Sequence, residues 1–534
     1  MSALGRALGI TLTGLQGDVV EVEADIGGGL PAFVLLGLPD AALAESRDRI
    51  RSAARNTGLP LSPRRITVNL LPAALPKRGS GLDLAILVAA LSADGAIPVV
   101  PDAAFIGELG LDGTIRPVAG VLPAVLAAAA HGIRRVVVPG ANLHEARLVP
   151  GVDVRAFEHA GELLAHLGVD TSLLVRHGAG HGAVASGSAR HDPSTGSDGS
   201  TGKDAARRAA ARDSSRPDFA DVRGQGLARY ALEVAAAGGH HVLLSGEPGA
   251  GKTMLAERLP GILPDLDDAQ ALEVTAIHSL HGRGAISALM RRPPLEAPHH
   301  NTTMAALIGG GSGVPHPGAA SRAHRGVLFL DEAPEFPAKV LDALRQPLEA
   351  GELTLHRSGG AATYPARFQL VLAANLCPCG RTGSPGHDCE CTALARRRYL
   401  SRLSGPLLDR IDLQINVPRV PPTQLTSGPT PESSADIAAR VAAARCRQAQ
   451  RLERYGLSHN GEIPGRLLRT ELAPQPRETA QINRAAEHGW LSARGIDRVL
   501  RIGWTIADLR GAERPAKADF DIALQLRQHR EASA

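Results

Sequence analysis

The stretch GEPGAGKT, from Gly246 to Thr253, decides the fold at the centre of this chain. It follows the apolar run His241–Leu244, which predicts a short buried strand, and it precedes Met254–Leu259, which predicts a helix. A glycine-rich loop between a strand and a helix points backbone N–H groups at phosphate oxygens. The sequence therefore predicts a phosphate-binding P-loop and the binding of a nucleoside triphosphate.

The residues of this loop have separate expected roles. Lys252 reaches the β and γ phosphates, and the Thr253 hydroxyl is a ligand for Mg²⁺. The chain has only five lysines against 53 arginines, so a lysine rarely falls at this position by chance. We expect ATP and Mg²⁺ as cofactors, held by Gly246, Glu247, Pro248, Gly249, Ala250, Gly251, Lys252 and Thr253.

Two later apolar runs end in polar residues that suit phosphoryl transfer. The run Gly326–Leu330 leads into Asp331 and Glu332. We expect Asp331 to hold the Mg²⁺ and Glu332 to polarise the attacking water. The run Phe368–Ala374 ends at Asn375, whose side chain can orient that water or sense the γ-phosphate. With Lys252, these three residues form the expected catalytic set.

A hairpin is predicted between the two runs, after a single helix expected over Val340–Leu348. Two strand-like arms flank a glycine-containing turn between Glu352 and Phe368, with His356 and Arg357 near the tip. The pattern does not distinguish an ordinary surface hairpin from a functional one.

Four of the five cysteines lie within fifteen residues, at Cys377, Cys379, Cys389 and Cys391. Two close pairs on short loops can form a Cys₄ zinc knuckle, which is structural because four protein ligands leave no open position. The one-residue spacing within each pair is tighter than usual, and His387 is an alternative ligand. Reduced, metal-free cysteines are the rival interpretation.

Arginines near the end of the chain are candidates for transition-state contacts. A helix end would project Arg410 outward, and in ring ATPases such an arginine enters the neighbouring subunit's site. An intrachain ion pair with Asp409 or Asp412 is the alternative. Three arginines in a later predicted helix can reach the γ-phosphate: Arg494, Arg498 and Arg501. For another arginine series a solvated face is favoured over nucleic-acid contact: Arg440, Arg445, Arg447, Arg451 and Arg454.

Composition and pattern divide the chain into parts. Residues 1–172 alternate strand-like and helix-like segments and predict an α/β domain; residues 173–216 are polar and Gly/Ser-rich and predict a flexible linker with solvated histidines. An ATPase core over 217–419, with the cysteine knuckle at 377–391, precedes a helical lid over 420–534. The net charge of +4 does not by itself demand nucleic acid. With no apolar span or signal core, we expect a cytoplasmic protein without a membrane partner.

The first domain resembles the catalytic domain of Lon proteases. The resemblance rests on LPKRGSGLDLAI, from Leu75, and on GELGLDGTIRPVAGVLPAVLAAAAHGIRRVVVP, from Gly107. Lon-type proteolysis needs a serine activated by a lysine. The register places Gly81 at the serine position, with Ser80 one position away, and Leu122 and Ala124 where the lysine is expected. The resemblance therefore implies a Lon-like α/β domain without a catalytic dyad.

Nearly the whole chain outside the linker resembles the magnesium-chelatase-like YifB/ComM family of AAA+ ATPases. The matching segments include GLPDAALAESRDRIRSA, PHHNTTMAALIGGG, AHRGVLFLDEAPEF, LSGPLLDRID and SARGIDRVLRIGWTIADL. Two departures from the family pattern are Leu376, where proline is usual, and Trp504, where arginine is common. The resemblance implies an AAA+ P-loop core with a helical lid and a homo-oligomeric, hexameric ring.

The resemblance also implies roles for particular residues. Arg410 becomes the arginine finger that acts in the neighbouring subunit, and Arg494 the sensor 2 arginine. The hairpin becomes a pore-facing element with His356 and Arg357 as DNA contacts. The implied activity is that of a DNA helicase promoting branch migration during DNA uptake and recombination, acting on single-stranded or branched DNA. A magnesium-chelatase ATPase subunit and a nucleotide-switched protein-interaction module are the alternatives.

Overall fold

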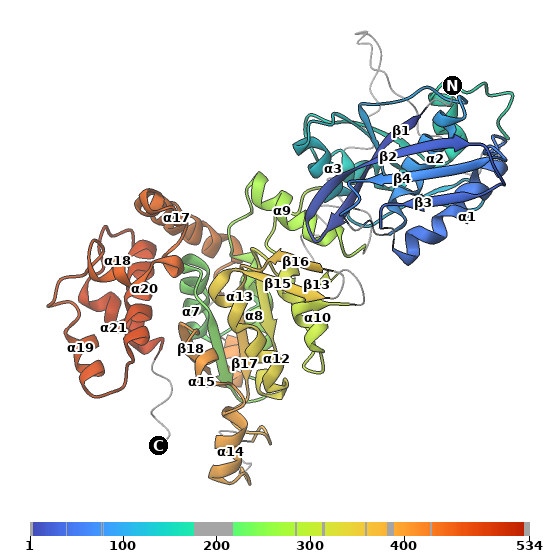
Figure 1. Ribbon diagram of the computed structural model, residues 1–534. Coiled ribbons are helices and arrows are strands. Elements are labelled where there is room, and N and C mark those ends of the chain that lie inside the picture. Colours follow the sequence, from blue (N-terminus) through green and yellow to red (C-terminus); the bar gives the residue numbers. More distant parts are fainter. Residues whose placement is uncertain are drawn as a thin grey trace. The chain divides into compact units, whose positions relative to one another are not determined.

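The computed structural model describes residues 4–38, 40–75, 77, 79–175, 217–282, 286–311, 315–357, 360–381, 389–427 and 430–527 (Figure 1). The chain divides into two compact units. The first comprises Met1–Arg216 with His278–Leu289, and the second comprises Pro217–Ile277 with Met290–Ala534. The sequence assigned residues 278–289 to the ATPase core, whereas the structure groups them with the first unit. Three histidines of the expected linker lie outside the described residues: His177, His181 and His191.

The first unit is built on a seven-stranded mixed sheet with the order β3-β4-β2-β1-β5-β8-β9. Its strands are β1 (Gly5–Thr13), β2 (Gln16–Gly27), β3 (Phe33–Leu36), β4 (Arg65–Leu71), β5 (Ala103–Phe105), β8 (Arg135–Pro139) and β9 (Asp153–Phe157), and β6 (Glu108–Leu109) pairs with β7 (Ile115–Arg116). Its helices are α1 (Ala41–Asn56), α2 (Asp83–Ala93), α3 (Val121–Ala130), α4 (Leu143–Ala146) and α5 (Ala160–His166).

Helix α2 forms the centre of this unit. All of its residues are buried, which explains why its sequence is apolar on every side rather than along one stripe. Its one charged residue, Asp83, is paired with Arg49 of α1 at 2.9 Å. Burial raises the pKa of Asp83, and the Arg49 guanidinium opposes that rise. The α/β architecture expected for this part of the chain is confirmed.

The second unit contains a five-stranded parallel sheet with the order β11-β14-β17-β10-β18. These strands are β10 (Val242–Gly246), β11 (Leu295–Glu296), β14 (Val327–Leu330), β17 (Gln369–Ala374) and β18 (Leu413–Val417). Strands β14 and β17 are buried along their whole length, as continuous apolar runs in a covered parallel sheet require.

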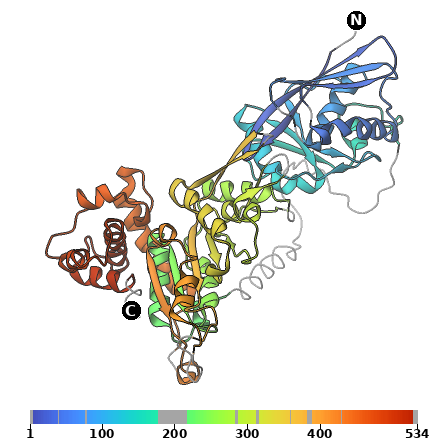
Figure 2. The same ribbon diagram turned by 60° about the horizontal axis from the view of Figure 1, so that its bottom comes forward.

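Helices and short strands surround this sheet. Those of the core are α7 (Gly226–Gly238), α8 (Lys252–Arg258), α9 (Asp268–Ser279), α10 (Met304–Ile308), β12 (Gly309–Gly310), β13 (His316–Pro317), α11 (Ala319–Arg322), α12 (Ala338–Ala343), α13 (Arg345–Ala350), β15 (Glu352–Arg357), β16 (Gly360–Pro365), α14 (Ala393–Leu400) and α15 (Gly405–Leu408). The C-terminal helices are α16 (Pro422–Ser427), α17 (Ser434–Leu452), α18 (Gly465–Arg469), α19 (Ala480–Glu487), α20 (Ala493–Arg510) and α21 (Lys517–Gln525). The group from α17 to α21, coloured orange-red to red, lies beside the core in both views (Figures 1 and 2).

The single helix expected over Val340–Leu348 is wrong, because the structure has two helices that meet at Leu344. Pro347 has no N–H to donate to the Ala343 carbonyl, so one continuous helix cannot form there. Pro347 is accommodated in the first turn of α13, where that donor is not needed. The segment therefore forms two short helices instead of one.

The solvated face expected for five arginines is present only in part. Arg447 and Arg454 are exposed, whereas Arg440, Arg445 and Arg451 are partly buried against neighbouring elements. Arg440 forms ion pairs with Glu233 and Glu432. Other α17 arginines reach backbone carbonyls of α7 and α20: Arg445 donates to Ala236, and Arg447 donates to Asp508. Helix α17 is therefore attached to its neighbours through these side chains.

Candidate functional site

The P-loop follows β10, a central strand of the parallel sheet, with β17 on one side and β18 on the other. Loops at the carboxyl ends of parallel strands are the usual ligand sites of such sheets. Gly246 must be glycine because a Cβ there would lie 2.3 Å from the Val417 carbonyl oxygen. Gly251 has a φ of 91°, a left-handed conformation that favours glycine, and α8 begins at the next residue.

The Lys252 side chain is held between the P-loop and the end of β17. Its Nζ donates to the carbonyls of Gly246 at 2.9 Å and Glu247 at 2.8 Å, and to Asn375 Oδ1 at 3.0 Å. Burial lowers the pKa of Lys252, and the carboxylates of Asp331, Glu332 and Glu247 oppose that shift. The structure therefore brings the expected lysine and asparagine into direct contact.

Thr253 and Asp331 also meet. The Thr253 hydroxyl donates to Asp331 Oδ2 at 2.6 Å, and the Glu332 backbone N–H donates to Asp331 Oδ1 at 2.8 Å. A hydroxyl and a carboxylate side by side next to a phosphate-binding loop are the oxygen donors that Mg²⁺ prefers. These residues fit the ion, which when bound would neutralise phosphate charge, and Thr253 and Asp331 would hold it.

Sequence analysis missed a partner of Glu332. His300 Nδ1 lies 3.2 Å from Glu332 Oε2, and the rings of His299 and His300 are 4.0 Å apart. Glu332 itself has a φ of 50°, which is unusual for a residue other than glycine. His300 follows β11, the strand next to β14, so parallel pairing brings it to the acidic residues. The run His299-His300-Asn301 stands out in the sequence, but nothing in it indicates that His300 contacts Glu332.

Gln225 is a second residue that the sequence did not reveal. Its Nε2 donates to the Ala250 carbonyl of the P-loop at 3.0 Å and to the Pro418 carbonyl after β18 at 2.6 Å. Gln225 thus connects the start of α7 to two loops at the nucleotide-binding edge. No local pattern could predict this contact, because both acceptors are backbone atoms remote in sequence.

Arg410 and Arg494 lie together on a separate cavity of about 760 Å³. The lining is made by Arg345, Gln346, Glu349, Ala350, Gly405, Pro406, Asp409, Arg410 and Arg494. We call it the arginine cavity. It includes no residue of the P-loop, neither Asp331 nor Glu332, and not Asn375.

The alternative partners proposed for Arg410 are wrong. Its guanidinium pairs with Glu349 and donates to the Pro406 carbonyl at 2.5 Å. Asp409 instead pairs with Arg494 at 2.9 Å, and Asp412 pairs with Arg498. Burial lowers the pKa of Arg410, and the positive charges of Arg345 and Arg494 lower it further.

Arg498 and Arg501, the other two candidates for a contact with the γ-phosphate, form contacts elsewhere in the chain. Arg498 forms its ion pair with Asp412 with only 12% of its side chain exposed, and Arg501 donates to the Ile463 carbonyl at 2.8 Å. Arg494, in contrast, is 67% exposed. Of the three arginines, it is the one presented to the arginine cavity.

The expected hairpin is present. Strands β15 and β16 pair antiparallel from Glu352↔Pro365 to Arg357↔Gly360. His356 is exposed opposite Ala361, and the side chain of Arg357 lies outside the described residues.

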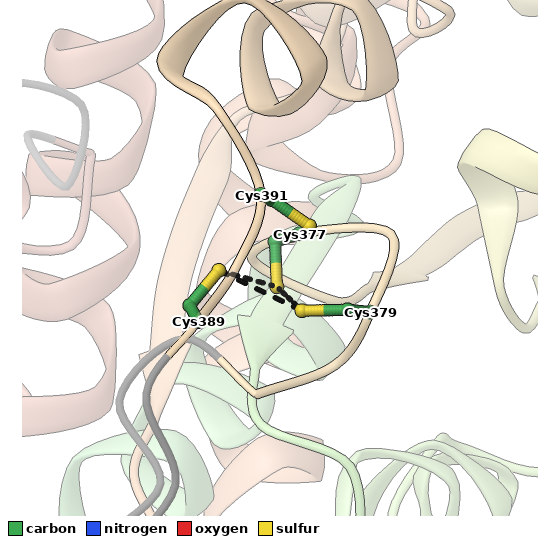
Figure 3. Close-up of side chains that lie close together, drawn as sticks. All are labelled: Cys377, Cys379, Cys389 and Cys391. Carbon is green, nitrogen blue, oxygen red and sulfur yellow. Dashed lines mark hydrogen bonds between the residues drawn. The ribbon is translucent and has the colours of Figure 1, made fainter.

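The four clustered cysteines converge (Figure 3). The Sγ atoms of Cys377 and Cys379 are 3.3 Å apart, those of Cys379 and Cys389 are 3.6 Å apart, and those of Cys377 and Cys389 are 3.7 Å apart. All four cysteines are free of disulfides. A tetrahedron with Zn–S bonds of about 2.3 Å has edges of roughly 3.8 Å, so the cluster has the dimensions of a Cys₄ metal site. The alternative ligand His387 lies outside the described residues.

The cysteine loop also contacts the P-loop. A Cβ on Gly380 would lie 2.6 Å from Cγ of Pro248, so the two loops are packed closely. Asn375, the acceptor from Lys252, precedes Cys377 by two residues. The cluster is therefore attached to the nucleotide-binding edge at two points.

In the first unit, the residues at and beside the expected serine and lysine positions of the Lon-type dyad have ordinary structural surroundings. Ser80 donates to Glu108, whereas Leu122 and Ala124 are buried in α3. A Cβ on Gly81 would meet open space. Lys77, which sequence analysis did not single out, is fully buried and donates to the Pro72 carbonyl.

Among the described residues, no helix is long and apolar enough to cross a lipid bilayer.

Three family models match the chain. The model described as magnesium chelatase, subunit ChlI, matches residues 218–425. Those described as subunit ChlI of Mg-chelatase and as its C-terminal region match residues 22–142 and 431–527. The second match lies within the Lon-like part of the chain. The chain is also 34% identical over 145 residues to a Lon protease of Salinispora arenicola, covering 26% of this chain and 19% of that protein.

Relatives match over nearly the full length. An uncharacterised protein of Mycobacterium tuberculosis is 48% identical over 529 residues, covering 98% of this chain and 99% of the relative. The uncharacterised protein YifB of Escherichia coli is 38% identical, covering 93% and 91% respectively. The competence protein ComM of Haemophilus influenzae is 37% identical, covering 94% and 92%. The parallel P-loop sheet, the Lon-like unit and these matches together show that the chain belongs to the YifB/ComM family of magnesium-chelatase-like AAA+ ATPases.

Proposed function

We propose that this protein is a cytoplasmic hexameric ATPase ring that acts as a helicase or branch-migration factor on single-stranded or branched DNA. The observation that carries the proposal is the separation of the P-loop site from the arginine cavity. Because the arginine cavity includes no residue of the P-loop, we assign the arginines of each nucleotide site to a second copy of the chain. In a ring, each subunit would supply the P-loop of one site and the arginine cavity of the next.

Hydrolysis is assigned to the residues around the P-loop. Lys252 and the loop N–H groups would bind the phosphates, and Glu332 would polarise the water that attacks the γ-phosphorus. Asn375 would orient that water or sense the phosphate. Arg410 would neutralise the charge that develops on the transferred group, with Arg494 beside it.

DNA binding is assigned to the β15–β16 hairpin. His356 is exposed there, and Arg357 is the last residue of the same strand. The name of the Haemophilus relative links a similar protein to competence. Contacts to backbone phosphates would make binding depend on salt and little on sequence.

The test is ATP hydrolysis by the purified protein with and without single-stranded and forked DNA, over a salt series. Stimulation that fades as salt rises supports a DNA motor. Turnover that is indifferent to DNA at every salt concentration contradicts it and favours a protein-interaction role for the Lon-like unit.

Two variants test the division of the site. Lys252→Ala should abolish nucleotide binding, whereas Arg410→Ala should keep binding and stop turnover. Lys339→Ala is the matched control, because Lys339 is an exposed lysine of α12. Normal turnover by the Arg410 variant would contradict the arginine-finger assignment.

We also propose that Cys377, Cys379, Cys389 and Cys391 hold a structural Zn²⁺. The distances among their Sγ atoms support this assignment, and so does the chemistry of four thiolate donors.

A further inference from the structure

The arginine cavity contains a third arginine that no assigned role explains. Arg345 is exposed at the start of α13, and the same helix contributes Gln346 and Glu349 to the lining. Arg345 has no ion-pair partner among the residues that the structure describes.

The charges of the cavity do not balance. Its cations are Arg345, Arg410 and Arg494, and its anions are Glu349 and Asp409. Glu349 pairs with Arg410, and Asp409 pairs with Arg494. One positive charge, that of Arg345, therefore remains uncompensated.

Arg345 and Arg494 are close enough to Arg410 to act on its charge. The charges of both Arg345 and Arg494 lower the pKa of Arg410, which burial has already lowered. Bringing like charges together costs free energy that a bound anion offsets. A multiply charged anion compensates all three arginines better than the two carboxylates do.

The carboxylate on Arg410 can be displaced. The Glu349 side chain is 60% exposed, whereas that of Arg410 is 11% exposed. The Glu349 carboxylate can therefore return to water, and the partly buried guanidinium that it leaves then favours another anion. A phosphate oxygen accepts hydrogen bonds from arginine in the same bidentate geometry as a carboxylate.

We propose that Arg345 is a further phosphate-contacting residue, which acts with Arg410 and Arg494 on the terminal phosphate of the nucleotide bound by a second copy of this chain. Glu349 occupies Arg410 until that phosphate replaces it. This inference rests on the proposed function, in which hydrolysis occurs between subunits.

The first experiment measures Arg345→Ala alone. Binding of a fluorescent ATP analogue to its own P-loop should stay at the wild-type affinity, which also shows that the chain folds. ATP turnover should fall roughly tenfold or more, in line with the loss of one positioned charge at a phosphoryl-transfer site. Arg345→Lys should retain part of the turnover, because it keeps the charge but not the planar fork. Arg466→Ala, at an exposed arginine of α18, is the matched control.

The second experiment mixes variants. Lys252→Ala removes the P-loop lysine but keeps the arginine cavity, and Arg345→Ala does the reverse. If Arg345 acts on a neighbour's nucleotide, mixing the two variants should give turnover above the sum of the separate samples. The mixture of Lys252→Ala with Arg410→Ala runs in parallel.

The outcomes separate the two ideas. Wild-type turnover by Arg345→Ala, or recovery in the Arg410 mixture without recovery in the Arg345 mixture, overturns the role of Arg345 and leaves the proposed function intact. Recovery in neither mixture overturns hydrolysis between subunits, and with it this inference.

Discussion

At the scale of single residues, the nucleotide site depends on short contacts between side chains from different strands. Lys252 reaches Asn375, Thr253 reaches Asp331, and Glu332 is held by His300. Each contact joins two parallel strands or the loops that follow them. The positions of these groups are therefore fixed by the sheet rather than by the loops alone.

His300 should matter for turnover and not for binding. Its contact of 3.2 Å with Glu332 orients the carboxylate that is assigned to the attacking water. We expect His300→Ala to lower the rate of ATP turnover roughly tenfold to a hundredfold, while affinity for an ATP analogue is kept. Steady-state kinetics and analogue titration measure the two quantities.

The control for this prediction is His488→Ala, at an exposed histidine at the end of α19. A change in analogue affinity equal to the change in turnover would show that His300 supports the loop itself, not Glu332.

At the scale of elements, buried polar contacts attach α17 to α20. Arg451 of α17 forms a bidentate pair with Asp508 of α20 at 2.6 and 2.7 Å, and Asn460 also donates to Asp508. The Arg451 guanidinium lies 4.5 Å from the centre of the Trp504 ring. Trp504, a departure from the family pattern, is thus used as an apolar and cation-binding surface.

Arg451→Ala should strongly destabilise the second unit, because it leaves the fully buried Asp508 carboxylate without its cation. We expect a loss of about 3–5 kcal/mol in the free energy of unfolding. Arg454→Ala breaks an exposed pair with Glu471 and should cost less than about 1 kcal/mol. Urea denaturation gives both values, and equal losses would contradict the distinction between buried and exposed pairs.

The cysteine cluster should hold the P-loop through Gly380 and Pro248. We expect about one zinc ion per purified chain, and none in the double variant Cys389→Ser/Cys391→Ser, because two thiolates cannot complete the tetrahedron. The double variant should also bind an ATP analogue more weakly. Metal analysis and analogue titration provide the measurements.

Cys446→Ser is the control, since Cys446 is an exposed cysteine remote in sequence from the cluster. Wild-type chain that contains no metal after purification without chelators would disprove the zinc assignment. If the zinc-free double variant bound the ATP analogue with unchanged affinity, the metal would stabilise only the cysteine loop and not the P-loop.

At the scale of the whole molecule, the stability of the second unit should depend on pH through His324. This side chain is 1% exposed, accepts a hydrogen bond from the Arg367 N–H at Nδ1, and lies 2.9 Å from Glu273 at Nε2. Burial lowers the pKa of His324, while Glu273 opposes the shift. Protonation at Nδ1 would also remove the acceptor for the Arg367 N–H.

Because the pKa is lower in the folded state, the unfolded state binds more protons as pH falls through the ordinary histidine pKa of about 6.5. The stabilisation is complete above that pH and decreases as pH falls below it. Both tryptophans, Trp490 and Trp504, belong to the second unit, so their fluorescence follows its unfolding in urea at each pH.

His324→Asn keeps an acceptor near the Nδ1 position and should give a flatter pH profile than the wild type. His488→Asn should keep the wild-type slope, because that histidine is exposed. If His324→Asn showed the wild-type slope, the dependence would belong to other groups.

Much of the architecture could be predicted from local patterns. The strands β10, β14 and β17 lie where apolar runs predicted them, and the hairpin lies where its glycine turn predicted it. The single helix at Val340–Leu348 was a wrong prediction, because periodicity outweighed the missing donor of Pro347. The expected solvated face was wrong for Arg440, Arg445 and Arg451, because charged side chains can cross to carbonyls and carboxylates of neighbouring helices.

The sequence by itself determined the P-loop, the acidic pair, Asn375 and the family, because each depends on a continuous stretch whose residue types carry the chemistry. Only the tertiary structure decided which groups meet. The pairing of His300 with Glu332 joins segments remote in sequence, and so does the arginine cavity, which brings Arg345 and Glu349 to Arg494. Distances between such segments are set by strand order and helix packing, which no local spacing encodes.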